Sequence, residues 1–475
     1  MFLLKPLTDR SVVKVKTYLI LKSLDVMKVF KILFCLILLT AVAISSQAQD
    51  NAKPLTLQES VQYAMQNSPQ IRIAQLSVEK NDQLVKEILS TGLPQVNLSG
   101  NYTYNLKIAT SLVPAEFFGG SAGEFAKVQF GTKMNTTFTG EVSQLLFSRT
   151  FFVGLKAAKE SRKLYELQTD QTKDEVAYTV AQLYYSIQVT QKQRNTLQAN
   201  LNQVRRLLDL TQKQFTNGLA KRIDVDQLQV NRINVENQIK NLDLEVEQLK
   251  QSLKFNMAMP LDQPITLTDT ISESSFTVPD IQMFTADFTQ KKDLAILDVQ
   301  AQLNQLNADQ YRYGYWPSLS AFGNYNYQGQ GNKFGDLTWF DFGAIGVNLN
   351  IPIFDGFKKR SQIQQAQIDQ LQLNETRRLT TQSINLAYNQ AMQELQTNIN
   401  NLQALLENRR ISEEVYRVSQ SRFTEGIAPI TEVLTAENSM REAQTNYLSA
   451  LLQVKLAEIA IQNSKGTLLN SITNN

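Results

Sequence analysis

The sequence contains no histidine and a single cysteine, and it is poor in the residues that form turns. The lack of histidine excludes Ser-His-Asp and Cys-His nucleophiles, histidine general bases and almost every catalytic zinc site. Cys35 lies inside an apolar run, so disulfides and thiolate metal clusters are excluded as well. Only 19 glycines and 11 prolines occur in 475 residues, which indicates long uninterrupted elements. Because histidine and paired cysteines are lacking, we expect no metal site and no cofactor.

Residues 27–48 have the order of parts that is typical of a secretory signal peptide. Two lysines precede an apolar stretch at 32–44, and small residues follow at 46–48. This stretch is shorter than the roughly 18 residues that a membrane-spanning helix needs. We predict that translation starts at Met27, after an upstream extension, and that the exported chain begins near Gln49.

The positive charge of the chain is confined to this leader. Residues 1–48 hold seven of the 47 basic and two of the 44 acidic residues, so the remainder carries 40 against 42, a net charge of −2. Binding to nucleic acid depends largely on positive charge. We expect no nucleic-acid partner.

Two segments of eleven residues recur in the second half of the chain, each with five identities. They are 94–104 with 317–327, and 215–225 with 423–433. The offsets of the two matches differ, because residues 105–130 form a longer connection than 328–337. We predict two structural repeats, 49–272 and 273–475.

Between these landmarks, apolar residues recur at alternating steps of three and four, the pattern of coiled-coil helices. The predicted helices are 69–91, 150–216, 221–258, 290–314, 357–424 and 429–464. The two longest would each measure about 100 Å at 1.5 Å per residue. In each half the two shorter helices together nearly equal the long one, so we expect them to stack end to end along it.

Each long helix is followed by a marked turn. Gly218 and Gly426 allow the left-handed conformation that ends many helices. Asp224, Asp226 and Glu432 then place carboxylates near the positive start of the returning helix. The sequence therefore predicts two helical hairpins.

Four segments between the helices alternate in polarity: 95–106, 132–146, 319–327 and 345–353. One face is apolar, and the other is rich in asparagine, threonine and serine. This pattern is typical of a lipid-facing β-barrel with a wet interior, although a sheet half-buried in a soluble core would show it too. Membrane barrels start at eight strands, and an open edge in lipid leaves backbone groups unpaired. A barrel would therefore have to be shared between subunits.

Over residues 55–465 the chain resembles the TolC-like outer-membrane efflux proteins in the order of its parts. The motifs that carry the resemblance lie at the helix-to-strand prolines, the strand-to-helix turns and the hairpin tips. They are Pro94, Pro317, Phe147-Ser148, Phe354-Asp355-Gly356, Asn-Gly-Leu-Ala at 217–220 and Glu-Gly-Ile-Ala at 425–428.

The resemblance implies a mixed α/β membrane protein and a homotrimer. Its twelve-stranded β-barrel would lie in the outer membrane of a Gram-negative bacterium and continue into a periplasmic α-helical coiled-coil barrel. Such a protein is a passive exit duct for drugs, metals or proteins, and is not an enzyme. It works with a periplasmic adaptor and an inner-membrane pump.

The resemblance also implies two functional sites at the periplasmic end. The adaptor would dock at the tips, formed by Asn217, Gly218, Leu219, Ala220, Glu425, Gly426, Ile427 and Ala428. A periplasmic gate would involve Glu432, Thr435, Asp224 and Asp226. Around a three-fold axis, Glu432 carboxylates would repel one another and attract cations. The other interpretation is that Glu432 is simply a carboxylate at a helix start.

Two other functions remain open at this point. An exported structural or adhesive coiled-coil protein would also have long heptad helices. An exported hydrolase could use paired carboxylates without histidine, and its candidate pairs are Asp224 with Asp226, or Glu413 with Glu414.

Overall fold

The computed structural model describes residues 53–269 and 284–473, so the predicted signal peptide and Cys35 lie outside the described residues. The chain divides into two units. In the smaller unit, β1 (Lys53–Leu55) pairs in parallel with β6 (Ile265–Leu267). The backbone N–H of Thr268 extends this pairing by donating to the Leu55 carbonyl at 3.1 Å. All the other elements belong to the larger unit.

The six predicted helices are all present, with ends within two residues of the prediction. They are α3 (Pro69–Ser90), α4 (Arg149–Thr216), α5 (Arg222–Met257), α6 (Lys292–Tyr313), α7 (Lys358–Thr424) and α8 (Ile430–Lys465). Of the helices in the described ranges, none has the length and the apolar content for crossing a membrane.

The predicted heptad positions form the contacts between these helices. Leu197 and Leu201 of α4 pack on Val235 and Ile239 of α5. A second apolar cluster joins α7 to α8, and every predicted seam position of α8 is buried. These seam residues are Val433, Ala436, Met440, Ala443, Tyr447, Ala450, Val454 and Ala457. The heptad prediction is confirmed.

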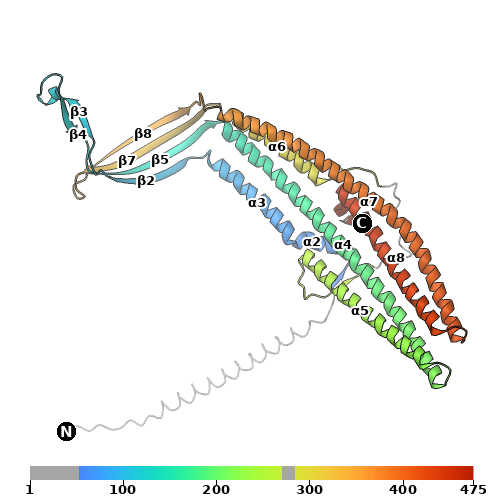
Figure 1. The fold of residues 1–475 in the computed structure, drawn as a ribbon. Helices are drawn as coiled ribbons and strands as arrows, with labels where there is room; N and C mark the ends of the chain where they lie inside the picture. The colour runs from blue at the N-terminus through green and yellow to red at the C-terminus, as the bar shows by residue number, and fades with distance from the viewer. Residues whose placement is uncertain (1–52, 270–283, 474–475) are drawn as a thin grey trace, which may run out of the picture. The chain divides into compact units, whose positions relative to one another are not determined.

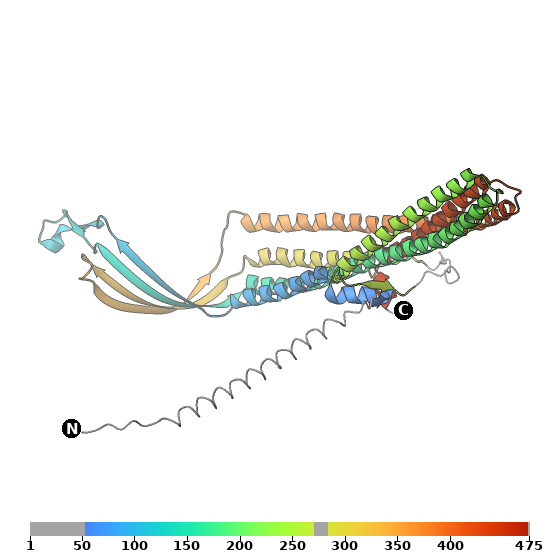
Figure 2. The same cartoon turned by 90° about the horizontal axis from the view of Figure 1, so that it is seen from below.

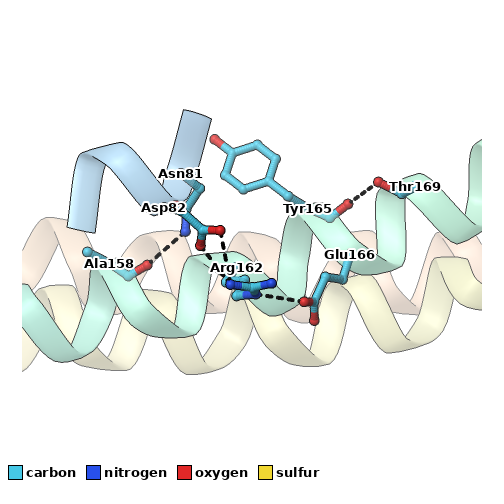
Figure 3. A network of polar contacts seen from close by, with 7 residues as sticks. All are labelled: Asn81, Asp82, Ala158, Arg162, Tyr165, Glu166 and Thr169. Atoms are coloured by element: carbon cyan, nitrogen blue, oxygen red, sulfur yellow. Dashed lines mark hydrogen bonds and ion pairs between the residues drawn. The ribbon is translucent and has the colours of Figure 1, made fainter. Parts of the chain in front are cut away.

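The shorter helices lie end to end beside the long ones, as expected. In both views α3 follows the part of α4 next to the strands and α5 follows the remainder, while α6 and α8 do the same along α7 (Figures 1 and 2). Figure 3 shows how α3 is held: Arg162 of α4 donates to both oxygens of Asp82, at 2.8 and 3.0 Å. The Asn81 amide donates to the Ala158 carbonyl at 3.2 Å.

Four antiparallel strands form one sheet in the order β2–β5–β7–β8. Their bounds are β2 (Gln95–Tyr104), β5 (Met134–Ser148), β7 (Ser318–Gly331) and β8 (Thr338–Asn350). The register places Leu98, Tyr325 and Ile345 on one face, and Asn97 and Asn324 on the other. The predicted division into an apolar and a polar face is therefore confirmed.

The predicted bounds of the last strand, 345–353, were wrong. Pro352 follows the strand and has no N–H for a ladder, and it restricts the residue before it. At the other end, β8 begins at Thr338 and carries Trp339 and Phe340 on opposite faces. Aromatic residues on both faces hide the alternation that would have marked this part as a strand.

Five elements of the larger unit were not predicted from the sequence. They are α2 (Leu57–Asn67), α9 (Leu468–Thr473), β3 (Thr110–Pro114), β4 (Phe125–Gln129) and the short 3-10 helix η1 (Ala115–Phe118). The start of α2 had a readable signal, a capping box. Thr56 and Glu59 bond reciprocally, with the Thr56 N–H donating to Glu59 Oε2 at 2.7 Å and the Glu59 N–H to Thr56 Oγ1 at 3.1 Å.

Candidate functional site

The two helical hairpins end in turns of the same geometry. Gly218 has φ +77° and Gly426 has φ +75°, the left-handed conformation that glycine adopts without steric cost. In the first turn the Leu219 N–H donates to the Gln214 carbonyl, and in the second the Ile427 N–H donates to that of Arg422, both at 2.8 Å. These bonds satisfy carbonyls that each helix end would leave unpaired.

Each turn presents one large apolar side chain to solvent. Leu219 is 80% exposed and Ile427 is 64% exposed. Asn217 and Glu425, which precede the tip glycines, are also exposed, whereas Ala220 is half-buried and Ala428 is buried. The eight predicted tip residues thus form two similar surfaces, each with an apolar centre.

Glu432 lies in the first turn of α8 and faces the end of α7. Arg422 donates from Nη1 to Glu432 Oε1 at 2.7 Å, and Ser419 Oγ donates to the same oxygen at 3.3 Å. Thr435, one turn later, donates its hydroxyl to the Thr431 carbonyl at 2.9 Å. Glu432, Thr435 and Ser419 line an open groove of about 540 Å³ along α7 and α8. Within one chain, the Glu432 carboxylate is thus paired with a cation.

The two acids of the first hairpin stabilise the start of α5. Asp224 Oδ2 accepts the backbone N–H of Lys221 at 3.1 Å, and Asp226 forms an ion pair with Arg222 at 2.9 Å. The structure therefore places Asp224 in the first turn of α5, near the positive end of the helix, as the sequence predicted.

The carboxylates of the second candidate pair have separate partners. Glu413 accepts the Gln444 amide at 3.0 Å, and Glu414 pairs with Arg417 at 2.5 Å. Both carboxylates are therefore engaged by neighbouring side chains rather than by each other.

A buried charged cluster lies farther along α8, and sequence reasoning missed it. Glu437 is 2% exposed and pairs with Arg441 at 2.7 Å. Asn231 of α5 donates to Glu437 at 3.3 Å, and Arg441 donates to Gln238 of α5 at 2.8 Å. The cluster therefore ties the second hairpin to the first. The i,i+4 spacing of Glu437 and Arg441 beside a seam position was the only sequence signal.

Burial governs the ionisation of this cluster. Desolvation raises the pKa of Glu437, and the nearby Arg441 guanidinium and the Asn231 hydrogen bond oppose that rise. Burial, reinforced by the Glu437 charge, also raises the pKa of Tyr416 on α7 to about 12. The site thus holds a carboxylate whose charged form is disfavoured by its surroundings.

The predicted junction residues lie where helices and strands meet. Pro94 directly precedes β2, and Pro317 directly precedes β7. Phe147 lies near the end of β5, beyond a bulge that follows Leu145. Phe354 lies between β8 and α7, with its ring 5.3 Å from that of Phe357.

The family model described as outer membrane efflux protein matches residues 60–257 and 289–467 of this chain. The chain belongs to the outer membrane efflux protein family. It is a channel for efflux across the outer membrane, and its helical part lies in the periplasm. The family is one of channels rather than of enzymes, and membership favours the export duct over a structural or adhesive coiled-coil protein.

Relatives of this outer membrane efflux protein agree in sequence and in fold. The outer membrane protein TolC of Vibrio cholerae is 24% identical over 434 residues, which cover 87% of this chain and 91% of TolC. The crystal structure of VceC from Vibrio cholerae has a TM-score of 0.65 at 16% identity, covering 86% of this chain and 96% of VceC. The CmeC outer membrane channel of Campylobacter jejuni has a TM-score of 0.65 at 15% identity, covering 87% and 86%.

Proposed function

We propose that this efflux protein is a homotrimer in which three copies of the sheet β2–β5–β7–β8 close one twelve-stranded barrel. The observation that carries the proposal is the sheet order, in which β2 and β8 each have one neighbour among the described strands. In lipid, each unpaired backbone group at such an edge costs several kcal/mol. Pairing β2 of one copy with β8 of the next removes both edges.

Apolar stripes on the outermost helices support the same closure. The contacts run α3–α4–α6–α7, so α3 and α7 are the edges of this layer. Ile73 and Leu84 of α3 and Leu371 and Leu379 of α7 are exposed in the single chain. A ring of three copies would bring α7 of one copy against α3 of the next and cover these side chains.

Mass measurement on the detergent-extracted protein tests the trimer. We expect three chains per particle. Leu371→Asp combined with Leu379→Asp should lower the trimer yield, because it places charge in the covered stripe. Asn374→Asp adds a charge outside the arc between the two leucines and keeps the oxygen that accepts the Gln370 amide, so it is the control and should leave the yield unchanged. A monodisperse monomer with protected strand amides would contradict the proposal.

We further propose that a periplasmic adaptor docks on the hairpin tips and joins the duct to an inner-membrane pump. The two exposed apolar side chains, Leu219 and Ile427, support this role. Leu219→Asp combined with Ile427→Asp should abolish export while the trimer yield stays normal. Thr216→Asp combined with Thr424→Asp places the same charge just before each tip and should leave export intact. Normal export by the first pair would exclude docking at these tips.

We also propose that Glu432 and Thr435 line the closed periplasmic end around the three-fold axis. Support comes from their position on the groove beside the tip of the second hairpin. Because each Glu432 pairs with Arg422, this end of a trimer would carry three guanidinium groups as well as three carboxylates. The contribution of Asp224 and Asp226 would be smaller, because neither residue lines this groove.

A further inference from the structure

The connection from β2 to β5 folds into a β-hairpin of its own. β3 and β4 pair antiparallel, with Leu112 opposite Lys127 and Pro114 opposite Phe125. The 3-10 helix η1 follows β3, and the Ala115 N–H donates to the Glu124 carbonyl at 2.8 Å to close the end of the hairpin. Both views show this hairpin projecting beyond the end of the sheet that lies away from the helices (Figures 1 and 2).

One face of the hairpin carries large apolar side chains with nothing over them. Leu112 and Phe125 share this face of the two strands, and Phe117 and Phe118 of η1 are exposed as well. Phe117 is 78% exposed and Phe125 is 65% exposed. On the opposite face the side chains are smaller, and Val113, Ala126 and Val128 are half-buried while Ser111 is exposed. Exposed apolar patches of this kind mark contact surfaces.

The hairpin continues an apolar surface that already faces lipid in the proposed barrel. Tyr104, the last residue of β2, and Leu106 after it belong to the apolar series of that strand, and Leu106 is exposed. At the same end of the sheet, Trp339 stacks on Tyr327 with ring centroids 4.8 Å apart. Aromatic residues gather at the two boundaries of a membrane, so this end of the sheet is at a membrane boundary.

The hairpin carries one lysine and two exposed glutamates, Glu116 and Glu124, so its charged groups suit a polar headgroup layer without a preference for anionic lipid. Lys127 is exposed and lies on the same face as Leu112 and Phe125. A lysine in this position can bury its aliphatic stem while its ammonium group reaches the lipid phosphates. Exposed phenylalanines beside such a lysine suit the boundary between lipid and water.

We infer that the β3–β4 hairpin lies on the outer leaflet and seats Leu112, Phe117, Phe118 and Phe125 in the lipid headgroup layer. The inference rests on the barrel proposed above, which fixes the apolar face of the sheet as the outer one. Because helices α3, α4, α6 and α7 lie at the periplasmic end, the hairpin lies at the outer end. The hairpin would thus anchor the duct beyond its strands.

Tryptophan fluorescence in proteoliposomes tests the inference, because the chain has only two tryptophans, Trp316 and Trp339. The reporter is Phe118→Trp in the full chain with Trp316→Phe and Trp339→Phe. The probe is a vesicle of phosphatidylglycerol and phosphatidylcholine whose acyl chains are brominated near the headgroup, since bromine quenches tryptophan on contact. We expect the reporter to lose as large a fraction of its fluorescence as Trp339 loses in the Trp316→Phe protein.

Two controls separate this inference from the barrel proposal. Thr103→Trp in the same background lies on the polar face at the depth of Tyr102 and Tyr104, and it should not be quenched. Quenching at Thr103→Trp but not at Trp339 would overturn the barrel orientation. Quenching at Trp339 with none at Phe118→Trp or at a second reporter, Phe125→Trp, would overturn the hairpin inference alone.

A further variant identifies the competing occupant. Phe118→Cys, combined with Cys35→Ser, would form disulfide-linked dimers if the three hairpins packed on one another. Such dimers together with unquenched reporters would show that a second copy, and not lipid, covers the apolar face.

Discussion

Arg422 and Glu432 join the two helices of the second hairpin directly beside its tip. Their ion pair measures 2.7 Å, and both side chains are more than one third exposed. An ion pair with this exposure contributes about 0–1 kcal/mol to the free energy of unfolding, so it adds little to the stability of the fold. It places a cation and an anion together at the end of the duct where closure is proposed.

Glu432→Ala tests this role. In a reconstituted trimer we expect altered conductance and weaker block by divalent cations, because a ring of three carboxylates would be lost. Asp224→Ala should have the smaller effect, since Asp224 does not line the groove that Glu432 and Thr435 line. Single-channel recording with added divalent cation measures both. Unchanged conductance and block, with only a lower melting temperature, would make Glu432 a helix-start charge and move the gate elsewhere.

The Glu437–Arg441 pair is a second site where a single substitution should have a large effect, in this case on stability. Arg441→Met leaves a buried carboxylate without its cation, which typically costs about 3–5 kcal/mol. The variant should therefore melt at a clearly lower temperature at neutral pH, measured by circular dichroism in detergent.

The loss of stability in Arg441→Met should depend on pH in a definite direction. Burial raises the pKa of Glu437, so the folded protein holds this proton to higher pH than the unfolded chain does. Protonation of Glu437 therefore stabilises the folded state. This stabilisation is complete below the pKa of a glutamate in the unfolded chain, about 4.3, and is lost as pH rises through the pKa of Glu437 in the folded protein. Without Arg441 that pKa rises further, so the deficit should shrink below about pH 4.

An exposed pair on α7 provides the control. Arg417→Met should change the melting temperature little at either pH, because both side chains of the Arg417–Glu414 pair are more than half exposed. An equal deficit for Arg441→Met at both pH values would mean that lost packing, and not the stranded charge, causes it.

At the scale of elements, the hairpin turns depend on backbone conformation more than on contacts. Gly426 has open space around the position of a Cβ atom, yet its φ of +75° disfavours any side chain. Gly426→Ala should therefore destabilise the turn by about 1–2 kcal/mol.

Hydrogen exchange at the Ile427 amide measures this local effect, since that N–H bonds to the Arg422 carbonyl within the turn. We expect exchange to become about five to thirty times faster. Gly335→Ala is the control, measured at the Asp336 amide that donates to the Lys333 carbonyl, because Gly335 also has open space but no left-handed φ. Equal acceleration in both variants would mean that the left-handed conformation is not what holds the tip.

At the scale of the whole molecule, a shared barrel makes one defective copy harmful to its neighbours. Cells that make equal amounts of the normal chain and of the chain with Leu219→Asp and Ile427→Asp should contain few fully normal trimers, roughly one in eight by random assembly. We expect export to fall well below half of the normal rate. Export at half the normal rate, with equal amounts of both chains, would instead indicate that each copy works alone.

Local periodicity determined much of this protein. The spacing of Val433, Ala436 and Met440 identified a helix seam, and the alternation from Gln95 to Tyr104 identified a strand, because both periods repeat over a few residues. The tip glycines and the prolines before the strands are equally local signals. For this reason the helices, the four-stranded sheet and the two tips could be predicted closely.

Tertiary structure decided everything that depends on residues far apart in the chain. Asn231 and Glu437 are separated by 206 positions, so no periodicity could show that the carboxylate is buried against the first hairpin. The β3–β4 pairing and the Arg422–Glu432 contact join residues that are closer in sequence, yet they too required the chain to fold back on itself. Helix and strand periods report which face of an element is apolar, but only packing determines which groups meet there and which apolar surfaces remain uncovered.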